Sequence, residues 1–508
     1  MVKVVVEGCC HGDLDEIYAN VPSSAELLII CGDFEALRNS ADLETMSVPR
    51  KYLKMGDFHR YYSGEKKAPV LTVFIGGNHE CSSYLRELQY GGWVAPNIYY
   101  LGHYGVVWFK GLRISGISGI WNYHSFISAM SKKNAPTYAL PYSDQTIKSV
   151  YHVVPKNYLK LLLSSTSDIV VSHDWPQYIW KWGNCAQLLR HKPFFRKDMD
   201  SGRLGSPLAR NALGRLKPRY WFSSHLHTRF VANVKHAEEF GVDEEAYLKK
   251  KVDGDHSRET PPEKSGEIML DMDEEVSCDK STGSEVQPTL KEASNEITLD
   301  IEENSSEIKI DMDENLDRSS ETKSDTNPGN ANPEAAGSSE ILLDLDDSVG
   351  AQQSMNNSVK RRKIAKTTHF LALDKCLPRR KFIEVLDIDP LTENSIYHDS
   401  GLYHDARSIA VNKVVEDFVS TNFSVWSSIN PHDLLHLDRI KGLINELEES
   451  ISREIPRIEQ LDLKVPSNFQ KCAPDNSQKD VSLQYWPNNQ TSDYCKAFGV
   501  PLPNLDGS

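Results

Sequence analysis

The chain has 508 residues, enough for two or three domains with hydrophobic cores. Its nine cysteines are odd in number and irregularly spaced, which excludes a simple disulfide framework and indicates a reducing compartment. The net charge is −15, but residues 251–350 hold 28 acidic and 8 basic residues, so the remainder carries a net +5 and the overall charge says little about the substrate.

The N-terminal apolar run is too short for a signal sequence, and no stretch of the chain is long and apolar enough to span a membrane. We therefore expect a soluble intracellular protein with no membrane partner.

Five short apolar runs lie within residues 1–239, and each leads into side chains that can bind a metal. The runs are Val2–Val6, Leu27–Ile30, Val70–Ile75, Ile169–Val171 and Tyr220–Phe222. The side chains that follow them are Cys9 and His11, then Asp33, then Asn78 and His79, then His173, and finally His225 and His227. The pattern predicts a mixed α/β domain whose strands end in ligand-bearing loops.

This set of side chains suits a site for two metal ions. A pair of cations can lower the pKa of water to give a nucleophile near neutral pH and can neutralise phosphate oxygens. Such a site needs imidazoles, a short carboxylate able to bridge and a neutral oxygen ligand, and all three are present. One histidine alone would most simply be a hydrogen-bonded structural residue, but five coincidences of strand and ligand favour a phosphoesterase.

Residues 240–367 have a different composition. Residues 251–350 contain no aromatic residue and are rich in Ser, Asn, Asp and Glu, so they cannot bury enough apolar surface to offset the entropy of ordering. We predict a disordered acidic insertion. A short acidic and apolar unit recurs within it, at Glu267, Glu296, Glu307 and Glu340. It resembles peptides that add a strand to a partner sheet, as SUMO-binding peptides do, or it is a repeat expansion in a solubilising segment.

Order is expected to return after the insertion, in residues 368–465. The alternating runs Thr368–Leu373 and Lys381–Val385 predict strands, and Leu437, Ile440, Ile444, Leu447 and Ile451 recur at helical spacing. Residues 466–508 are polar with scattered Pro and Asn, and we predict a poorly ordered tail there.

The order of these motifs resembles the calcineurin-like metallophosphoesterases. Two positions depart from that pattern, because Cys9 stands where an aspartate is usual and Ser224 precedes His225 where a glycine is usual. The segments Gly8–Gly12, Gly32–Asn39 and Tyr90–Gly102 resemble a narrower family, the RNA lariat debranching enzymes, strongly over residues 1–235 and more weakly over 368–450. The resemblance implies an α/β/β/α sandwich followed by a helical C-terminal domain.

The resemblance also implies the metal ligands. One ion would be held by Cys9, His11, Asp33 and His227, and the second by Asp33, Asn78, His173 and His225, with Asp33 bridging. Because a thiolate prefers softer cations, Cys9 predicts Fe²⁺ or Zn²⁺, with Mn²⁺ binding less strongly. The alternative is that Cys9 is only a small buried residue.

His79 matches the catalytic histidine that the family resemblance implies. It would protonate the leaving oxygen, or it would only hold a phosphate oxygen by its charge, and the sequence does not separate these roles. Arg38 and Asn39 match positions beside the site, where they could touch the branch of the RNA. The aromatic and basic stretch from Trp121 to His152 would recognise RNA through Tyr123, His124, Lys132 and Lys133, or it is an ordinary surface loop.

The function that the resemblance implies is metal-dependent hydrolysis of the 2′-5′ phosphodiester at the branch of excised intron lariat RNA. The basic cluster Lys360–Lys363 is typical of nuclear import signals, which predicts a nuclear protein. Two alternatives are a phosphoesterase that acts on nucleotides or phosphoproteins, and a non-catalytic binding module on the same fold. The first leaves Cys9 and residues 90–102 unexplained, and the second requires lost ligands.

Overall fold

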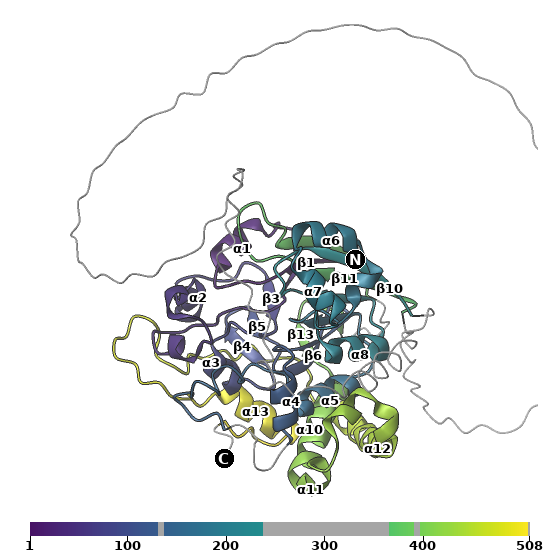
Figure 1. Cartoon of the computed structure of the whole chain (residues 1–508). Coiled ribbons are helices and arrows are strands. Elements are labelled where there is room, and N and C mark those ends of the chain that lie inside the picture. Colours follow the sequence, from purple (N-terminus) through teal and green to yellow (C-terminus); the bar gives the residue numbers. More distant parts are fainter. Residues whose placement is uncertain (131–136, 237–364, 391–396, 506–508) are drawn as a thin grey trace, which may run out of the picture. The chain divides into compact units, whose positions relative to one another are not determined.

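The computed structural model describes residues 1–130, 137–236, 365–390 and 397–505. Within these residues two mixed β-sheets pack face to face, with helices on both outer faces (Figure 1). The arrangement is the α/β/β/α sandwich expected of the calcineurin-like fold, so the predicted fold class is confirmed.

The first sheet has six strands in the order β12-β1-β2-β3-β5-β4. Their bounds are β1 Val2–Glu7, β2 Leu27–Ile30, β3 Leu71–Phe74, β4 Gly92–Ala95, β5 Ile98–Tyr100 and β12 Ile383–Ile388. Strands β1, β2, β3 and β5 run parallel to one another, whereas β4 and β12 are antiparallel edges.

The second sheet has seven strands in the order β10-β11-β9-β8-β7-β6-β13. Their bounds are β6 Tyr104–Phe109, β7 Leu112–Ile117, β8 Ile169–Ser172, β9 Tyr220–Ser223, β10 Phe230–Lys235, β11 Thr367–Ala372 and β13 Leu402–His404. Strands β7, β8, β9 and β11 are parallel, so their carboxyl ends lie at one edge of the sheet.

Side chains alternate between the faces of each strand, and both faces of the central strands are apolar. In β2, Leu27 and Ile29 point into the core between the sheets, whereas Leu28 and Ile30 pack under the helices of the outer face. Both sets are buried, which explains why the sequences of these strands are continuously apolar instead of alternating between apolar and polar residues.

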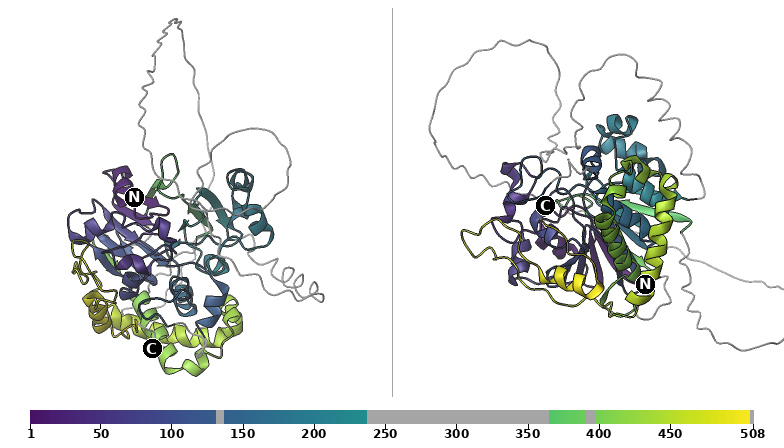
Figure 2. Two further views of the ribbon diagram at one scale, coloured as in Figure 1. Left: turned by 60° about the vertical axis from the view of Figure 1, so that its left-hand side comes forward. Right: turned by 90° about the horizontal axis from the view of Figure 1, so that it is seen from below.

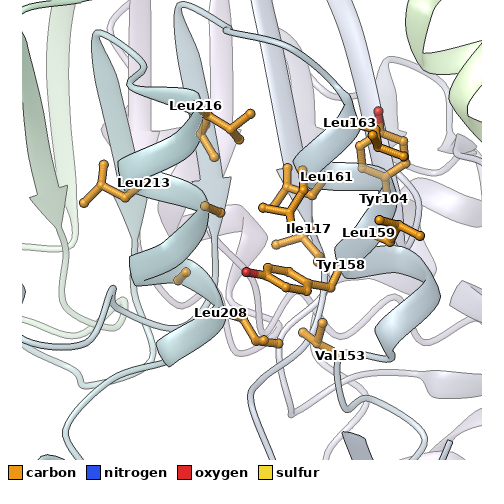
Figure 3. Close-up of a cluster of buried hydrophobic side chains, with 14 of the residues drawn as sticks. Tyr104, Ile117, Val153, Tyr158, Leu159, Leu161, Leu163, Leu208, Leu213 and Leu216 are labelled. Carbon is orange, nitrogen blue, oxygen red and sulfur yellow. The ribbon is translucent and has the colours of Figure 1, made fainter. Parts of the chain in front are cut away.

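Helices cover the two outer faces. Against the first sheet lie α1 (Leu14–Asn20), α2 (Phe58–Ser63) and α3 (Ser82–Glu87). Against the second lie α5 (Pro155–Leu163), α6 (Cys185–His191), α7 (Phe195–Asp200), α8 (Pro207–Leu216), α10 (Ala406–Thr421), α11 (Phe423–Trp426) and α12 (Lys441–Ile458). Figure 3 shows how α5 and α8 bury Tyr158, Leu161 and Leu213 in one apolar cluster. The remaining helices are α4 (Tyr123–Ser128), α13 (Asn489–Phe498) and the 3₁₀ turns Asp42–Thr45, Arg50–Tyr52, Ile179–Trp182, Pro431–Leu435 and Leu437–Ile440.

The amphipathic helix predicted from its apolar spacing is α12. It begins at Lys441, four residues later than the pattern indicates, because Leu437–Ile440 form a 3₁₀ turn instead. Ile444, Leu447 and Ile451 are buried as the helical spacing requires.

Residues that follow the acidic segment complete both sheets. Strand β11 pairs with β10 and with β9, and β12 pairs with β1. Residues 365–390 are therefore part of the same sandwich as residues 1–236. The boundary expected from the sequence between residues 367 and 368 does not separate two independent hydrophobic cores.

We predict that a variant lacking residues 245–358 folds and keeps close to the full activity of the wild-type protein, which the family resemblance implies to be cleavage of branched RNA. Lys235 pairs with Thr367, and the N–H of His236 donates to the carbonyl oxygen of Lys366 at 3.0 Å, so the described residues that flank this part of the chain are paired with each other. Closing the short remaining loop has a small entropic cost. A deletion variant that keeps its circular dichroism spectrum but is inactive would show that the segment takes part in the reaction.

Residues after 465 form more structure than the polar sequence predicts. Helix α13 lies within the predicted tail, and Gln490 exchanges hydrogen bonds with the backbone of Trp93 at 2.7 and 2.8 Å. Tyr62 donates to the carbonyl oxygen of Ala473 at 2.8 Å. In both views of Figure 2 the yellow C-terminal segment runs along the purple N-terminal half. The expectation of a poorly ordered tail is wrong for these residues, because long-range hydrogen bonds order a segment that has little apolar surface of its own.

Several predictions concern residues outside the described ranges. They are Lys132 and Lys133, the four acidic repeats and the cluster Lys360–Lys363.

Candidate metal centre and active site

The carboxyl ends of the parallel strands bring the predicted ligands together. Cys9, His11, Asp33 and His227 follow β1, β2 and β9, and one potential ligand atom from each lies within 4.8 Å of the others. All four residues are buried. Two of the strands belong to the first sheet and one to the second, so the group lies where the ends of both sheets meet.

The backbone at this group is strained in a consistent way. The φ angles of His11, Asp33, His225 and His227 are +47°, +50°, +63° and +47°. Non-glycine residues rarely adopt this left-handed region, although Asp and His are enriched there, and such conformations cluster at functional sites. The four residues with this conformation are themselves predicted metal ligands, so the unusual backbone coincides with the candidate site.

The first group has the chemistry of a cation site. The Nε2 atoms of His11 and His227 lie 3.1 Å apart, and Nε2 of His11 is 3.7 Å from Oδ2 of Asp33. Burial lowers the pKa of His11 and lowers the pKa of His227 well below its usual value, so both rings are neutral near pH 7. Two neutral imidazoles beside an anion present lone pairs to a common point, which suits a divalent cation.

The second group forms on the other oxygen of Asp33. Nε2 of His173 lies 3.3 Å from Oδ1 of Asp33 and 3.2 Å from Oδ1 of Asn78. The Nδ1 atom of His173 is 2.8 Å from the carbonyl oxygen of Cys31, so it is the protonated nitrogen and Nε2 faces the site.

Asp33 is the residue that the two groups share, one through each carboxylate oxygen. Oδ1 also accepts the backbone N–H groups of Asn78 and His79, at 2.9 and 2.8 Å. Burial by itself would raise the pKa of Asp33, but the surrounding histidines, His173 foremost, lower it well below the usual value. An ionised carboxylate in this position has the geometry of a bridging ligand.

His225 lies next to the second group. Its ring centroid is 5.0 Å from that of His173, and burial, together with the charge of His173, lowers its pKa to about 3. Nε2 of His225 is 3.7 Å from Oδ1 of Asp174, and Oδ2 of Asp174 accepts the backbone N–H of Trp121 at 2.6 Å. Asp174 therefore links the metal centre to the aromatic stretch that begins at Trp121, a connection that the sequence pattern does not reveal.

Cys9 is held from two sides. Its Sγ accepts the backbone N–H of His225 at 3.1 Å, and its own backbone bonds to Asp374 and Cys376 of the segment after the acidic insertion. Burial, with Asp33 nearby, raises the pKa of the Cys9 thiol well above its usual value. A thiolate in this position therefore needs a cation beside it, which is consistent with a metal ligand.

His79 lies at the rim of the first group. Its ring centroid is 5.4 Å from that of His11, and its buried Nδ1 has no hydrogen-bond partner. Burial lowers its pKa, with Asp33 acting in the opposite direction. The residue as a whole is only partly buried, and the negative charge of a phosphate beside it would favour the protonated form of the ring.

Two neighbours of these residues hold the loops in place and were not among the predicted site residues. The carboxylate of Glu80 accepts the backbone N–H groups of Phe34 and Gly77, both at 2.8 Å, and so ties the loop of Asp33 to the loop of Asn78. A Cβ atom on Gly77 would overlap Oδ1 of Asp33, so only glycine fits there. Glu80 is part of the motif that contains Asn78 and His79, and this is the only sequence signal for its role.

Arg38 and Asn39 are buried and bonded within the protein, and their contact with the branch of the RNA stays a prediction. Arg38 is fully buried, with its guanidinium bonded to the carboxylates of Asp42 and Glu87 at 2.9 to 3.2 Å. Asn39 is also buried, and its side chain donates to the carbonyl oxygen of Pro474 at 2.7 Å. Both residues have their polar atoms satisfied inside the protein, so their role is to hold the loop that follows Asp33.

Tyr123 and His124 are exposed at the start of α4, immediately after Trp121. The hydroxyl of Tyr123 lies 3.2 Å from Nε2 of His432, which belongs to the C-terminal helical part. Trp121, two residues before Tyr123, is bonded to Asp174 beside His225, and the RNA contacts of Tyr123 and His124 remain predictions.

Comparisons with known proteins agree with this geometry. Residues 2–229 match the family model of the calcineurin-like phosphoesterases, which implies divalent metal ions, and residues 365–503 match that of the lariat debranching enzyme C-terminal domain. Relatives named lariat debranching enzyme include those of Gallus gallus, 36% identical over 98% of this chain and 70% of the relative, and of Schizosaccharomyces pombe, 35% identical over 98% and 95%. The enzyme of Drosophila melanogaster is 52% identical over 46% of this chain and 44% of its own length.

Both family models fall on the described sandwich, and the matches to the Gallus gallus and Schizosaccharomyces pombe relatives each cover 98% of this chain. The chain therefore belongs to the lariat debranching enzyme family, within the calcineurin-like phosphoesterases.

Proposed function

We propose that this protein hydrolyses the 2′-5′ phosphodiester bond at the branch point of excised intron lariat RNA and releases linear RNA. The observation that carries the proposal is the pair of donor groups that share Asp33, in a chain whose relatives are lariat debranching enzymes. In the reaction, water adds to phosphorus and the bond from phosphorus to the 2′ oxygen breaks, which leaves a hydroxyl at the branch.

The donor set fits two divalent ions. Cys9, His11, Asp33 and His227 would hold one, and Asn78, His173 and His225 would hold the other together with Asp33. Bound ions supply positive charge to the phosphate oxygens and lower the pKa of water. Within the protein, the backbone N–H groups at residues 78 and 79 fix the carboxylate of Asp33 between the two groups.

His79 is the residue best placed to assist the leaving group. The 2′ oxygen leaves poorly unless it is protonated or its charge is neutralised. The ring of His79 is only partly buried and lies beside the first donor group, where it would donate a proton to that oxygen or place its charge beside the phosphate.

The metal in the first group follows from Cys9. A soft thiolate gains more from Fe²⁺ or Zn²⁺ than from the harder Mn²⁺ or Mg²⁺, so we propose Fe²⁺ or Zn²⁺ there. The second group offers only nitrogen and oxygen donors, which suit Fe²⁺, Zn²⁺ or Mn²⁺.

The Cys9→Asp variant is predicted to lose its preference for Zn²⁺ and Fe²⁺ and to use Mn²⁺ better, because a carboxylate is a harder ligand than a thiolate. Cys9→Ser is predicted to lose the first ion more completely than the second. Metal content by mass spectrometry, with activity titrated against each cation, measures both effects. If the wild type, Cys9→Asp and Cys9→Ser bound the same metals in the same amounts, Cys9 would not be a metal ligand.

The function itself is tested by comparing a synthetic branched RNA with a linear 3′-5′ RNA of the same composition. Cleavage of the branch, with the linear RNA left intact and the metal content measured on the same sample, is the expected result. Equal cleavage of both RNAs, or turnover of a nucleotide or phosphoprotein substrate only, would overturn the proposal.

We also propose a nuclear location, where lariats form, on the basis of the basic cluster Lys360–Lys363. A partner that accepts the acidic repeats as an added strand remains a prediction from sequence, because both features lie outside the described residues. Within the described residues, no helix is long and apolar enough to cross a membrane.

A further inference from the structure

A cavity of about 260 Å³ lies behind the active-site turn, the turn at Gly76 and Gly77 that leads into Asn78 and His79. It is bounded by Gly76 and Gly77 on one side, by α3 on another, and by residues from the 137–157 segment and from α11. Its apolar wall includes Tyr138, Val150 and Trp426. The ligand groups of the metal centre do not line this cavity, so it is a separate space within the sandwich.

Arg86 of α3 lines the cavity and is the main reason to regard it as a binding site. Its side chain is more than nine-tenths buried, with an exposed fraction of 8%. The guanidinium stacks over the ring of Tyr138 at 4.4 Å and donates one hydrogen bond, of 2.7 Å, to the carbonyl oxygen of Leu505. Among the described residues, its Nε has no hydrogen-bond partner and no carboxylate pairs with the guanidinium.

A buried arginine without a carboxylate is unusual, because removal of a charge from water is costly unless the charge is paired. Arg38 and Arg113 of this protein follow the usual rule, since each is buried against at least one carboxylate. Arg86 is the exception among these three buried arginines. An anionic ligand that bonds to Nε would supply the missing partner.

The groups around Arg86 add positive charge rather than compensate it. Lys156 lines the cavity and shares the carboxylate of Glu416 with Lys160, at 2.8 and 2.6 Å, so two lysines have one acidic partner. Burial and these cations lower the pKa of His103, which also lines the cavity, to about 3, so its ring is neutral. The only carboxylate among the described lining residues belongs to Glu80, and it already accepts the backbone N–H groups of Phe34, Glu35 and Gly77 at 2.8 to 3.0 Å rather than a bond from Arg86.

We propose that this cavity is a nucleotide-binding site, in which Arg86 binds the phosphate and the base lies against the apolar wall. A phosphate supplies oxygens that match the planar array of N–H donors of arginine. The buried hydroxyl of Ser82, which has no hydrogen-bond partner, and the amides of Gln89 and Asn157 are additional polar groups in the lining.

The nucleotide can come from two sources with the same chemistry. It is either a nucleotide of the bound RNA, away from the branch, or a free mononucleotide. The first source rests on the function proposed above, whereas the second does not. Either ligand would contact residues that are bonded to the active-site turn, because Ser118 and Gly119 line the cavity. The carbonyl oxygen of Gly76 accepts the N–H of Gly119 at 2.8 Å, and the N–H of Gly76 donates to the hydroxyl of Ser118 at 2.9 Å.

The experiment measures binding of adenosine 5′-monophosphate and of inorganic phosphate by calorimetry. It uses the full chain after its metals have been removed with a chelator, so that phosphate cannot bind at the metal centre. The wild-type protein is expected to bind the nucleotide more tightly than inorganic phosphate. Arg86→Met is expected to reduce nucleotide affinity at least tenfold, and Arg203→Met, which alters an exposed arginine, is the matched control.

A second variant covers the case in which Arg86→Met does not fold. Asn157→Asp places a negative charge at a partly exposed position in the lining and should also weaken nucleotide binding by repulsion. Circular dichroism spectra and melting curves establish that each variant is folded before binding is measured.

The source is identified with metal-loaded protein and two branched RNAs, a minimal one and one with long arms. If the RNA supplies the nucleotide, Arg86→Met raises KM for the long RNA several-fold and leaves KM for the minimal RNA unchanged. If a free nucleotide is the ligand, the variant loses nucleotide binding with both KM values unchanged.

Two results would overturn the site. One is that neither nucleotide nor phosphate binds the metal-free wild-type protein while KM for the long RNA is unaffected in the variants. The other is that the nucleotide binds the wild-type, Arg86→Met and Asn157→Asp proteins equally well. The calorimetric measurements do not depend on cleavage of the branch, so a failure of this site and a failure of the proposed function are distinguishable.

Discussion

Replacement of His79 by alanine is expected to reduce the rate of branch cleavage by about 10²–10⁴-fold, the range typical for loss of a general acid. Replacement of Asn78 should have a comparable effect, because its Oδ1 lies 3.2 Å from Nε2 of His173 in the second donor group. Both residues are on a loop and neither belongs to an apolar core cluster, so the melting temperature should change little.

The measurement is single-turnover cleavage of a branched RNA at saturating metal, with metal content determined for each variant. His191→Ala is a suitable control, because that histidine is exposed at the end of α6. His79→Ala should keep both ions, whereas Asn78→Ala should lose part of the second. Rates close to wild type in both variants would exclude a catalytic role for this loop.

The Asp405→Ala variant is expected to lose about 3–5 kcal/mol of stability, the cost of removing one partner of a buried ion pair. Asp405 accepts two hydrogen bonds from the guanidinium of Arg113, both at 2.9 Å, and one from Nε1 of Trp108 at 2.8 Å. It also caps α10 by accepting the N–H of Ser408 at 2.8 Å. Without Asp405, the guanidinium would remain buried with no carboxylate partner and the first turn of α10 would lose its cap.

Denaturant unfolding of the variant and of wild type measures this loss. Asp198→Ala, which breaks the pair with the exposed Arg203, is the control and should cost no more than about 1 kcal/mol. Burial alone would raise the pKa of Asp405, but Arg113 lowers it below the usual value, so the pair stabilises the fold above about pH 4 and this contribution is lost as the pH falls further. An equal loss in both variants would contradict the structural role given to Asp405.

Side chains predicted as metal ligands come together in the structure because their positions are set locally. Asp33, Asn78 and His173 each follow an apolar strand directly, and parallel strands bring their carboxyl ends to one edge. The position of each side chain therefore follows from its place after a strand, without knowledge of distant contacts.

Residues whose role depends on distant partners were not predictable in the same way. Arg38 follows Asp33 closely and has the charge to meet a phosphate, but Glu87, which lies 49 residues later, binds its guanidinium inside the protein. The order of residues 466–505 depends in the same way on hydrogen bonds to Tyr62 and Trp93, hundreds of residues earlier. Local composition contains no information about such pairings.

The position of β11 has a consequence for folding during synthesis. This strand lies between β9 and β10, and the backbone that follows it holds Cys9, yet roughly 130 residues separate β10 from β11 in the chain. At about 5–20 residues per second, the ribosome needs on the order of 10 s to add them. During that time the edge of β9 has no partner strand and is open to pairing with other chains. The length of the acidic segment thus sets how long the nascent enzyme needs protection from aggregation.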